Sequence, residues 1–126
     1  MVPTDGLSHI QLAVRDLERS CRFYTELLGM TVLRRFGTSA VMLRTPGSRE
    51  VFTLNQDAEE AERAGQMGGI AHFGFRMREP ADMAAVLDAA ARAGGSPIKH
   101  GKRGDELYAF FTDPDGYELE LFWAPD

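Results

Sequence analysis

Apolar and polar residues alternate in short runs along this chain, and the order of these runs is repeated in its two halves. Residues 7–14 alternate with period two, which predicts a strand. The two faces of this strand hold Ile10, Leu12 and Val14 on one side, and His9, Gln11 and Ala13 on the other. Residues 70–77 alternate in the same way, and His72 again stands third in the run.

A helix is predicted after each of these strands, because apolar residues recur there at intervals of three and four. In the first half Asp16 is the expected N-cap and Gly29 the expected C-terminal stop. In the second half Glu79-Pro80 is expected to open the helix and Gly94-Gly95 to end it. The predicted apolar stripes are Leu17, Cys21, Tyr24 and Leu28, then Met83, Val86, Leu87, Ala90 and Ala91.

Three short strands are predicted after each helix, so that both halves have the order βαβββ. The expected strands are residues 30–36, 40–44 and 51–54, then 96–99, 107–112 and 116–123. The distance from the strand histidine to the glycine that ends the helix is similar in the halves, 20 residues (9 to 29) and 22 (72 to 94). A repeat of this length predicts two similar modules.

The predicted fold class is therefore α+β, with two βαβββ modules forming a curved, half-barrel-like sheet cup and helices outside. We expect one domain over residues 1–126, with module one at about 5–56, a connector at 57–69 and module two at about 70–124. The connector is acidic and poor in apolar residues, and several glycines follow it.

A turn and a carboxylate stand out near the C-terminus. Asp113-Pro114-Asp115-Gly116 has the composition of a tight turn and separates two apolar runs. In the second run Glu120 lies on the face opposite Leu119 and Leu121. A carboxylate within an aromatic strand is costly on a dry face, so Glu120 requires either water or a cation. By strand parity it shares the concave face with His9 and His72.

Composition narrows the function only a little. The chain has 126 residues, a net charge of −5 and a pI of about 5.2, which argues against general binding to nucleic acid or to anionic membranes. One cysteine, Cys21, excludes a disulfide within the chain. The expected location is the cytoplasm, since no apolar run is long enough to span a membrane.

These residues resemble the vicinal oxygen chelate superfamily, which includes glyoxalase I, extradiol ring-cleavage dioxygenases, fosfomycin-resistance enzymes and bleomycin-binding proteins. The resemblance covers about residues 5–124. Its carriers are His9, residues 16–20, Phe23-Tyr24, Leu27-Leu28-Gly29-Met30, His72-Phe73-Gly74-Phe75, and residues 113–120.

The resemblance implies a metal site. His9, His72 and Glu120 match ligand positions of the superfamily, and the expected cofactor is a divalent ion, Fe²⁺ ahead of Mn²⁺, Ni²⁺ or Zn²⁺. Glyoxalase I enzymes carry a further glutamate where this chain has Thr53. That difference argues against glyoxalase I, and it leaves the ligand set of the dioxygenase and fosfomycin-resistance branches. Glu118, on the same face as Glu120, is interpreted as a solvated carboxylate.

The catalytic residues implied by the resemblance are less clear. Extradiol dioxygenases have a tyrosine ten residues before the carboxylate ligand, and this chain has Phe110 there. Tyr108 and His100 are the candidate acid–base or orienting groups. The candidate residues of the substrate cup are Gln11, Thr53, Phe110 and Phe122. Residues 99–104 are basic and contain two glycines, and they are interpreted either as a lid over an anionic substrate or as a solvated loop.

The sequence thus favours a metal-dependent enzyme acting on a small oxygen-rich molecule, with an extradiol-dioxygenase-like reaction ranked first. The alternatives are a fosfomycin-type thiol transferase or another lyase or isomerase of the superfamily, and a binding protein without chemistry that resembles the bleomycin-binding members. The expected partner is a small-molecule substrate, with no nucleic acid and no membrane. The resemblance is also compatible with a homodimer.

Overall fold

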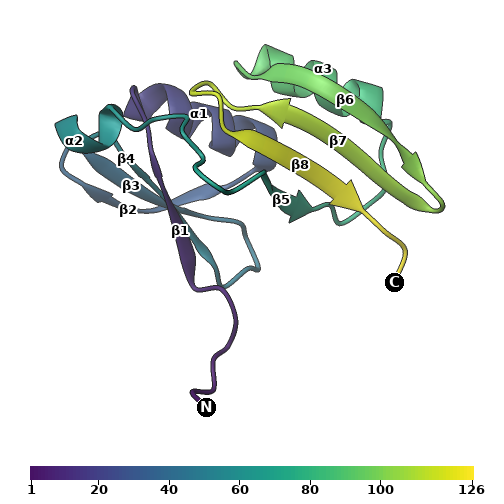
Figure 1. Ribbon diagram of the computed structural model, residues 1–126, viewed down its shortest axis with the longest axis horizontal. Helices are drawn as coiled ribbons and strands as arrows, with labels where there is room; N and C mark the ends of the chain where they lie inside the picture. The colour runs from purple at the N-terminus through teal and green to yellow at the C-terminus, as the bar shows by residue number, and fades with distance from the viewer. The chain divides into compact units, whose positions relative to one another are not determined.

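The computed structural model describes all residues from 1 to 126. The chain divides into two compact units, Met1–Ala64 and Gly65–Asp126, and the division falls within the predicted connector. Each unit contains one four-stranded mixed sheet and one main helix (Figure 1). The predicted class, α+β with two βαβββ modules, is confirmed. No helix is both long and apolar enough to cross a membrane.

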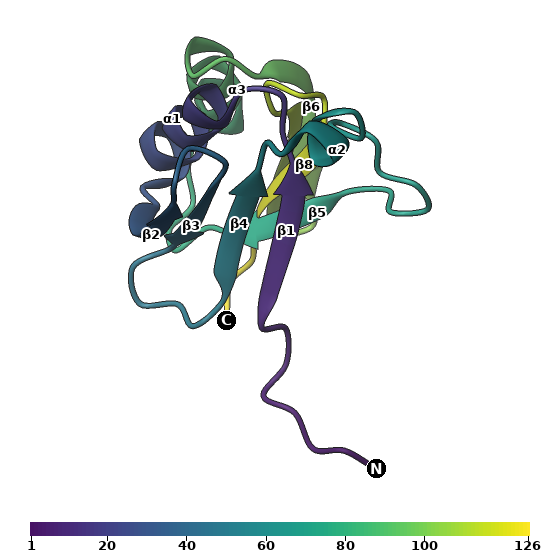
Figure 2. The same cartoon turned by 90° about the vertical axis from the view of Figure 1, so that its left-hand side faces the viewer.

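The sheet of the first unit has the strand order β1-β4-β3-β2, with β1 parallel to β4 and the other pairs antiparallel (Figure 2). Its strands are β1 (His9–Ala13), β2 (Thr31–Phe36), β3 (Ala40–Arg44) and β4 (Val51–Asn55). The buried face is apolar and includes Leu12, Val41, Leu43, Phe52 and Leu54.

Helix α1 (Leu17–Leu28) packs on β3 and β4. Asp16 caps it as predicted, because its side chain accepts a hydrogen bond of 3.1 Å from the Arg19 N–H. Gly29 ends it in the left-handed conformation, with φ of 68°. Tyr24 is fully buried, and its ring centroid lies 4.6 Å from that of Phe52. The predicted stripe therefore anchors this helix to the sheet.

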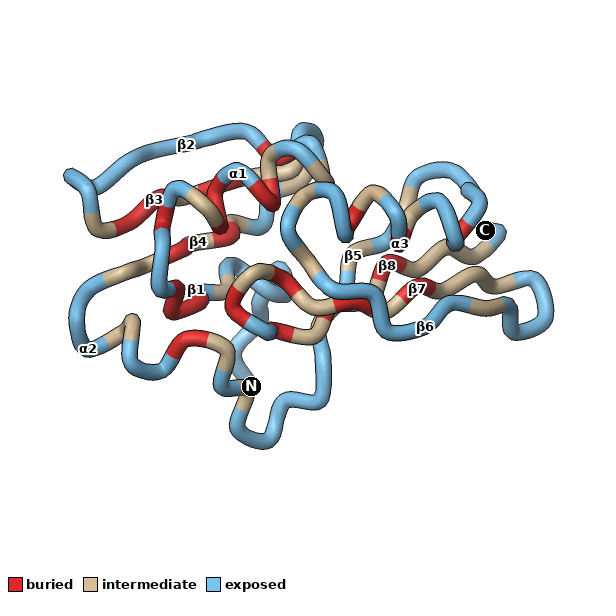
Figure 3. Tube along the Cα trace, turned by 90° about the horizontal axis from the view of Figure 1, so that it is seen from above, coloured by how far each residue is buried: buried red, intermediate tan, exposed pale blue.

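The sheet of the second unit repeats the topology as β5-β8-β7-β6, again with the first pair parallel and the other pairs antiparallel. Its strands are β5 (Phe73–Arg76), β6 (Ser96–Arg103), β7 (Glu106–Thr112) and β8 (Glu118–Trp123). Ala109, Phe111, Leu119 and Leu121 are buried on one face, and helix α3 (Met83–Arg92) packs on β6 and β7. Figure 3 shows this alternation as buried and intermediate segments along β7 and β8.

Three expectations need correction. Helix α3 begins at Met83 and not at Glu79-Pro80, because Asp82 caps it by accepting a 3.0 Å hydrogen bond from the Ala84 N–H. Residues 99–103 are not a loop or lid, since they continue β6 and pair with β7. Strand β5 begins one residue after His72, which lies just ahead of it. In addition, a short helix, α2 (Ala58–Ala61), forms within the acidic stretch.

Candidate metal centre

Two predicted ligands come together in the second unit, at the parallel pair of β5 and β8. Gly74 pairs with Glu120, and Phe73 with Leu119, so that His72 stands just before the first residue of β5, beside the start of β8. His72 Nε2 lies 3.5 Å from a carboxylate oxygen of Glu120. His72 Nδ1 lies 3.9 Å from a carboxylate oxygen of Glu118. The imidazole is therefore placed between two carboxylates, with the closer one at Nε2.

The turn between β7 and β8 fixes the position of the two carboxylates. Asp113 is 3% exposed, and its Oδ1 accepts hydrogen bonds from the backbone N–H groups of Asp115 (2.9 Å) and Tyr117 (3.0 Å). Gly116 takes a φ of 100°, which a residue with a side chain rarely adopts. The Asp-Pro-Asp-Gly sequence thereby sets where β8 starts, and with it the register that brings Glu120 opposite Gly74.

Because residue 74 is a glycine, β5 can lie close to the backbone of Glu120 on β8. A Cβ added to Gly74 would lie 2.8 Å from the Glu120 carbonyl oxygen and 3.4 Å from the Glu120 Cβ. Because the nearer atom belongs to the backbone, a larger residue would force β5 and β8 apart. Gly74 therefore permits the close approach of the two strands that carry His72 and Glu120.

The spacing of His72 and Glu120 fits two ligands of one metal ion. Ligand atoms that each lie about 2.1 Å from an ion are separated by about 3.0–3.4 Å at octahedral to tetrahedral angles, close to the 3.5 Å observed. The side chains are 38% and 22% exposed, so the pair is open on one side. Imidazole and carboxylate together suit first-row divalent ions. No group of three or more His, Cys, Asp or Glu side chains in the structure is arranged to hold a metal ion.

The residues predicted for module one lie together on one face of the first sheet. His9 starts β1, is exposed, and its Nδ1 lies 3.1 Å from the Ser8 hydroxyl. Gln11 pairs with Thr53, and His9 pairs with Val51, so that Thr53 shares the face of His9 and Gln11. Thr53 therefore occupies this face without contributing a charge. His9 belongs to the unit Met1–Ala64 and stays a predicted ligand.

Aromatic side chains lie on the same face as the His72–Glu120 pair, and one of them contacts His72. Phe110 pairs directly with Glu120, and its ring lies edge-on to that of His72 at a centroid distance of 5.0 Å. Tyr108 pairs with Phe122 one step further along the sheet, and its ring lies 5.9 Å from that of Phe110. Tyr108 therefore lies next to both predicted cup residues, Phe110 and Phe122.

His100 is not brought to this group. It pairs with Ala109 on β7, and Ala109 is fully buried on the helix-covered side of the sheet, opposite Tyr108 and Phe110. The alternation of an extended strand accounts for this placement. Tyr108, and not His100, therefore shares the face of Glu120.

Sequence reasoning missed Arg76 on this face, and it placed the cations Lys99 and Arg103 in a loop. Arg76, Lys99 and Arg103 each hold a charged group over an aromatic ring of β7 or β8. Parity within residues 70–77 could have placed Arg76 with His72. Lys99 and Arg103 were recognised as basic but not placed on a strand, because glycines and charges in this stretch resemble a loop and because a bulge between Pro97 and Lys99 shifts the register.

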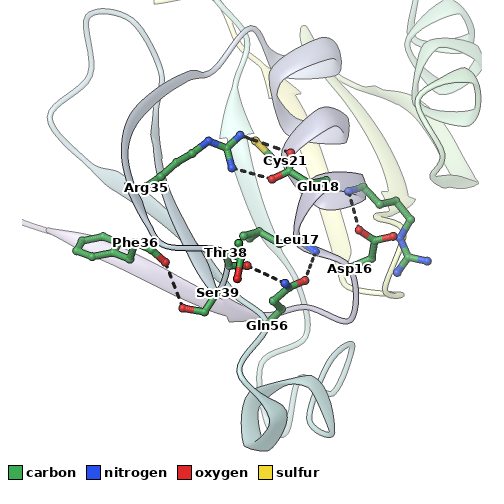
Figure 4. Close-up of polar contacts among 10 residues, drawn as sticks. Asp16, Leu17, Glu18, Cys21, Arg35, Phe36, Thr38, Ser39 and Gln56 are labelled. Carbon is green, nitrogen blue, oxygen red and sulfur yellow. Dashed lines mark hydrogen bonds and ion pairs between the residues drawn. The ribbon is translucent and has the colours of Figure 1, made fainter.

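Cys21 lies on α1 in the first unit, beside Arg35 of β2 (Figure 4). It is 5% exposed, and burial raises the pKa of its thiol. The Arg35 guanidinium, 3.9 Å from the sulfur, opposes this rise in pKa, and the Glu18 carboxylate, which is bound to Arg35 at 2.7 Å, adds to it. A buried, protonated thiol is a poor nucleophile, which agrees with a packing role.

The fold and the histidine–carboxylate pair define a class, and comparison with known proteins identifies it. The family model of the "Glyoxalase/Bleomycin resistance protein/Dioxygenase superfamily" matches residues 6–121. The chain belongs to this superfamily, as the sequence motifs predicted. A glyoxalase-related enzyme from Fulvimarina pelagi has the same fold, with a TM-score of 0.77 over 97% of this chain and 90% of that chain at 22% identity.

Two curated relatives carry enzyme names. The glutathione transferase FosA of Serratia marcescens is 34% identical over 92% of this chain and 79% of its own length. A lactoylglutathione lyase of Salmonella typhimurium is 31% identical over 95% of this chain and 93% of its own length. These names correspond to the transferase and lyase alternatives predicted from the sequence, and they give no specific support to the dioxygenase that was expected first.

Proposed function

We propose that this chain is a metal-dependent thiol transferase that joins glutathione or a similar thiol to a small oxygen-rich electrophile such as an epoxide. The proposed ligands, two histidines and one carboxylate, with the neutral Thr53 on the face where glyoxalase I enzymes have a further glutamate, suit this reaction, although the dioxygenases have the same set. The similarity to a glutathione transferase over most of both chains supports it. We therefore rank the extradiol-dioxygenase-like reaction below thiol transfer.

His9, His72 and Glu120 are the proposed ligands of a divalent ion. Such an ion, when bound, polarises oxygen atoms of the substrate and stabilises the negative charge that develops on them. His72 and Glu120 are already spaced to share an ion, which favours binding without rearrangement of this half of the site. Phe110 lies beside both residues and forms an apolar flank of the pair.

The proposed reaction adds a thiol across an oxirane ring. The sulfur forms a bond to a ring carbon, the bond from that carbon to oxygen breaks, and the proton that leaves the thiol ends on the released oxygen. Tyr108, on the same face as Glu120, stays the proposed hydrogen-bond donor to this oxygen, although its hydroxyl lies over Gly101 of β6 and its ring must turn toward β8 to donate. Its donation would favour ring opening, because charge develops on the oxygen as the bond breaks.

Lactoylglutathione lyase activity is the second candidate, since a relative with that name covers 95% of this chain. Thr53 argues against it. A hydroxyl is a weaker ligand than an ionised carboxylate for a first-row divalent ion, and it leaves the site one negative charge short.

The test is consumption of glutathione thiol by chelator-treated protein, with fosfomycin as the epoxide and Mn²⁺, Fe²⁺, Ni²⁺ or Zn²⁺ added back separately. We expect metal-dependent loss of thiol, and little conversion of the methylglyoxal–glutathione adduct with any of the ions. Robust turnover of that adduct would establish the lyase instead. Oxygen uptake with catechols, or epoxide binding without turnover, would favour a dioxygenase or a binding protein respectively.

A further inference from the structure

Three cations lie over three aromatic rings on the face that carries Glu120. Lys99 Nζ is 5.2 Å from the ring centroid of Phe110, Arg103 Cζ is 5.7 Å from that of Tyr108, and Arg76 Cζ is 5.5 Å from that of Phe122. These distances are within the range of cation–π attraction, which holds a charged group above the ring face.

Strand pairing places the two arginines at one end of this face. Tyr108 and Phe122 are direct cross-strand partners, so their Cβ atoms are about 5 Å apart, and the guanidinium groups lie over adjacent rings. Both rings stand two residues along their strands from the Phe110–Glu120 pair, a distance of about 7 Å. The arginines are therefore displaced along the sheet from the candidate metal ligands.

Gly101 provides the room that Tyr108 occupies. It pairs with Tyr108 across β6 and β7, and a Cβ added to it would lie 2.5 Å from the Tyr108 hydroxyl and 2.7 Å from Cζ. The ring of Tyr108 therefore lies across the backbone of β6. Arg103, two residues after Gly101 on the same strand, can then place its guanidinium group over this ring.

Neither arginine is neutralised by a carboxylate of its own unit. The side-chain hydrogen bond of Arg76 goes from its guanidinium group to the Ala124 carbonyl oxygen, at 3.3 Å. Arg103 lies over the Tyr108 ring and forms no ion pair, although Glu106 is its cross-strand partner on β7. Glu106, Glu118 and Glu120 share this face, but neither guanidinium group is paired with a carboxylate, so both remain able to attract an anion. A guanidinium group keeps its in-plane donors free when its face rests on a ring, and these donors match carboxylate and phosphate oxygens.

We propose that Arg76 and Arg103, seated on Phe122 and Tyr108, form a binding site for a carboxylate or phosphate group. The ligand of the whole face is then elongated, with oxygen donors at the His72–Glu120 end and an anionic tail at the arginine end. The inference that one substrate contacts both this site and the metal ligands rests on the proposed function. The anion site itself does not depend on that function.

The test uses the full-length, chelator-treated protein, so that it does not depend on the metal. Inorganic phosphate, glutarate and, as a neutral control, 1,5-pentanediol are titrated while the side-chain Nε–Hε resonances of the arginines are followed by NMR. We expect saturable shifts for Arg76 and Arg103 with at least one of the two anions, and none with the diol. The anion that binds more tightly identifies the tail as phosphate or carboxylate.

The variant Arg76→Gln/Arg103→Gln should weaken anion binding by about tenfold, because both charge-assisted contacts are lost. Arg92→Gln, at the end of α3, is the matched control and should bind as the wild type does. Gly101→Ala displaces the Tyr108 ring and should also weaken binding. Equal affinity in the wild type and the double variant, or no binding of either anion, would overturn the proposal. If thiol transfer fails but the anions bind as expected, the proposed function falls and this site stands.

Discussion

At the scale of single residues, Gly74 is the position where the backbone limits the candidate metal site most directly. A methyl group there would meet the Glu120 carbonyl oxygen at 2.8 Å, and a backbone atom cannot rotate away as a side chain does. The strain would fall on the pairing of β5 with β8, which sets the distance from His72 to Glu120.

We predict that Gly74→Ala lowers the free energy of unfolding by about 1–3 kcal/mol, the usual cost of overpacking. It should also weaken Mn²⁺ binding, since the two ligand side chains move apart. Thermal unfolding and calorimetric titration measure the two effects. Gly69→Ala is the control, because a Cβ at that position meets nothing within 4 Å. Normal stability and normal Mn²⁺ affinity in Gly74→Ala would show that the site tolerates a wider spacing.

At the scale of elements, the turn that joins β7 to β8 connects stability to the site. The buried carboxylate of Asp113 accepts two backbone hydrogen bonds, and its own N–H donates to the Tyr117 carbonyl oxygen at 2.9 Å. Without the carboxylate, two buried N–H groups lose their acceptor.

Asp113→Ala should therefore reduce the free energy of unfolding by about 2–4 kcal/mol. Asp113→Asn keeps one acceptor oxygen in place and should lose less. Chemical denaturation of the two variants and the wild type gives the order of stability. If Asp113→Ala were as stable as the wild type, the turn would not be held by these bonds.

The elements also show which parts of the structure could be predicted. Both helices and most strands follow from periodicity, and the buried faces of β7 and β8 follow from alternation, because one face of each is covered by apolar packing. The prediction was wrong for β6. Gly101 and Gly104 suggest a flexible loop in the sequence, yet Gly101 is extended and leaves room for the Tyr108 ring. This contact arises between strands and has no local signature.

At the scale of the whole molecule, the repeat was predicted and the sheets confirm it, since β1-β4-β3-β2 and β5-β8-β7-β6 have the same order and the same parallel first pair. The candidate site was less predictable. Residues 9, 72 and 120 are too far apart in sequence for their spacing to indicate a metal site, and only the superfamily resemblance selected them. The structure adds the 3.5 Å approach of His72 to Glu120, and the third ligand, His9, stays a prediction.

The most direct test of the account is metal binding by single variants of the proposed ligands. Calorimetric titration of chelator-treated protein with Mn²⁺ should show one site per chain in the wild type. His9→Ala, His72→Ala and Glu120→Ala should each weaken it by about a hundredfold or more, because loss of a direct ligand costs more than loss of a supporting residue.

Glu118→Ala is the matched control, since Glu118 lies on the same strand face but its carboxylate is 3.9 Å from His72 Nδ1, beyond hydrogen-bond distance. We predict that this variant retains Mn²⁺ affinity within about tenfold of the wild type. Unchanged affinity in His9→Ala, His72→Ala and Glu120→Ala, or a loss in Glu118→Ala as large as in Glu120→Ala, would contradict the assignment of His9, His72 and Glu120 as the metal ligands.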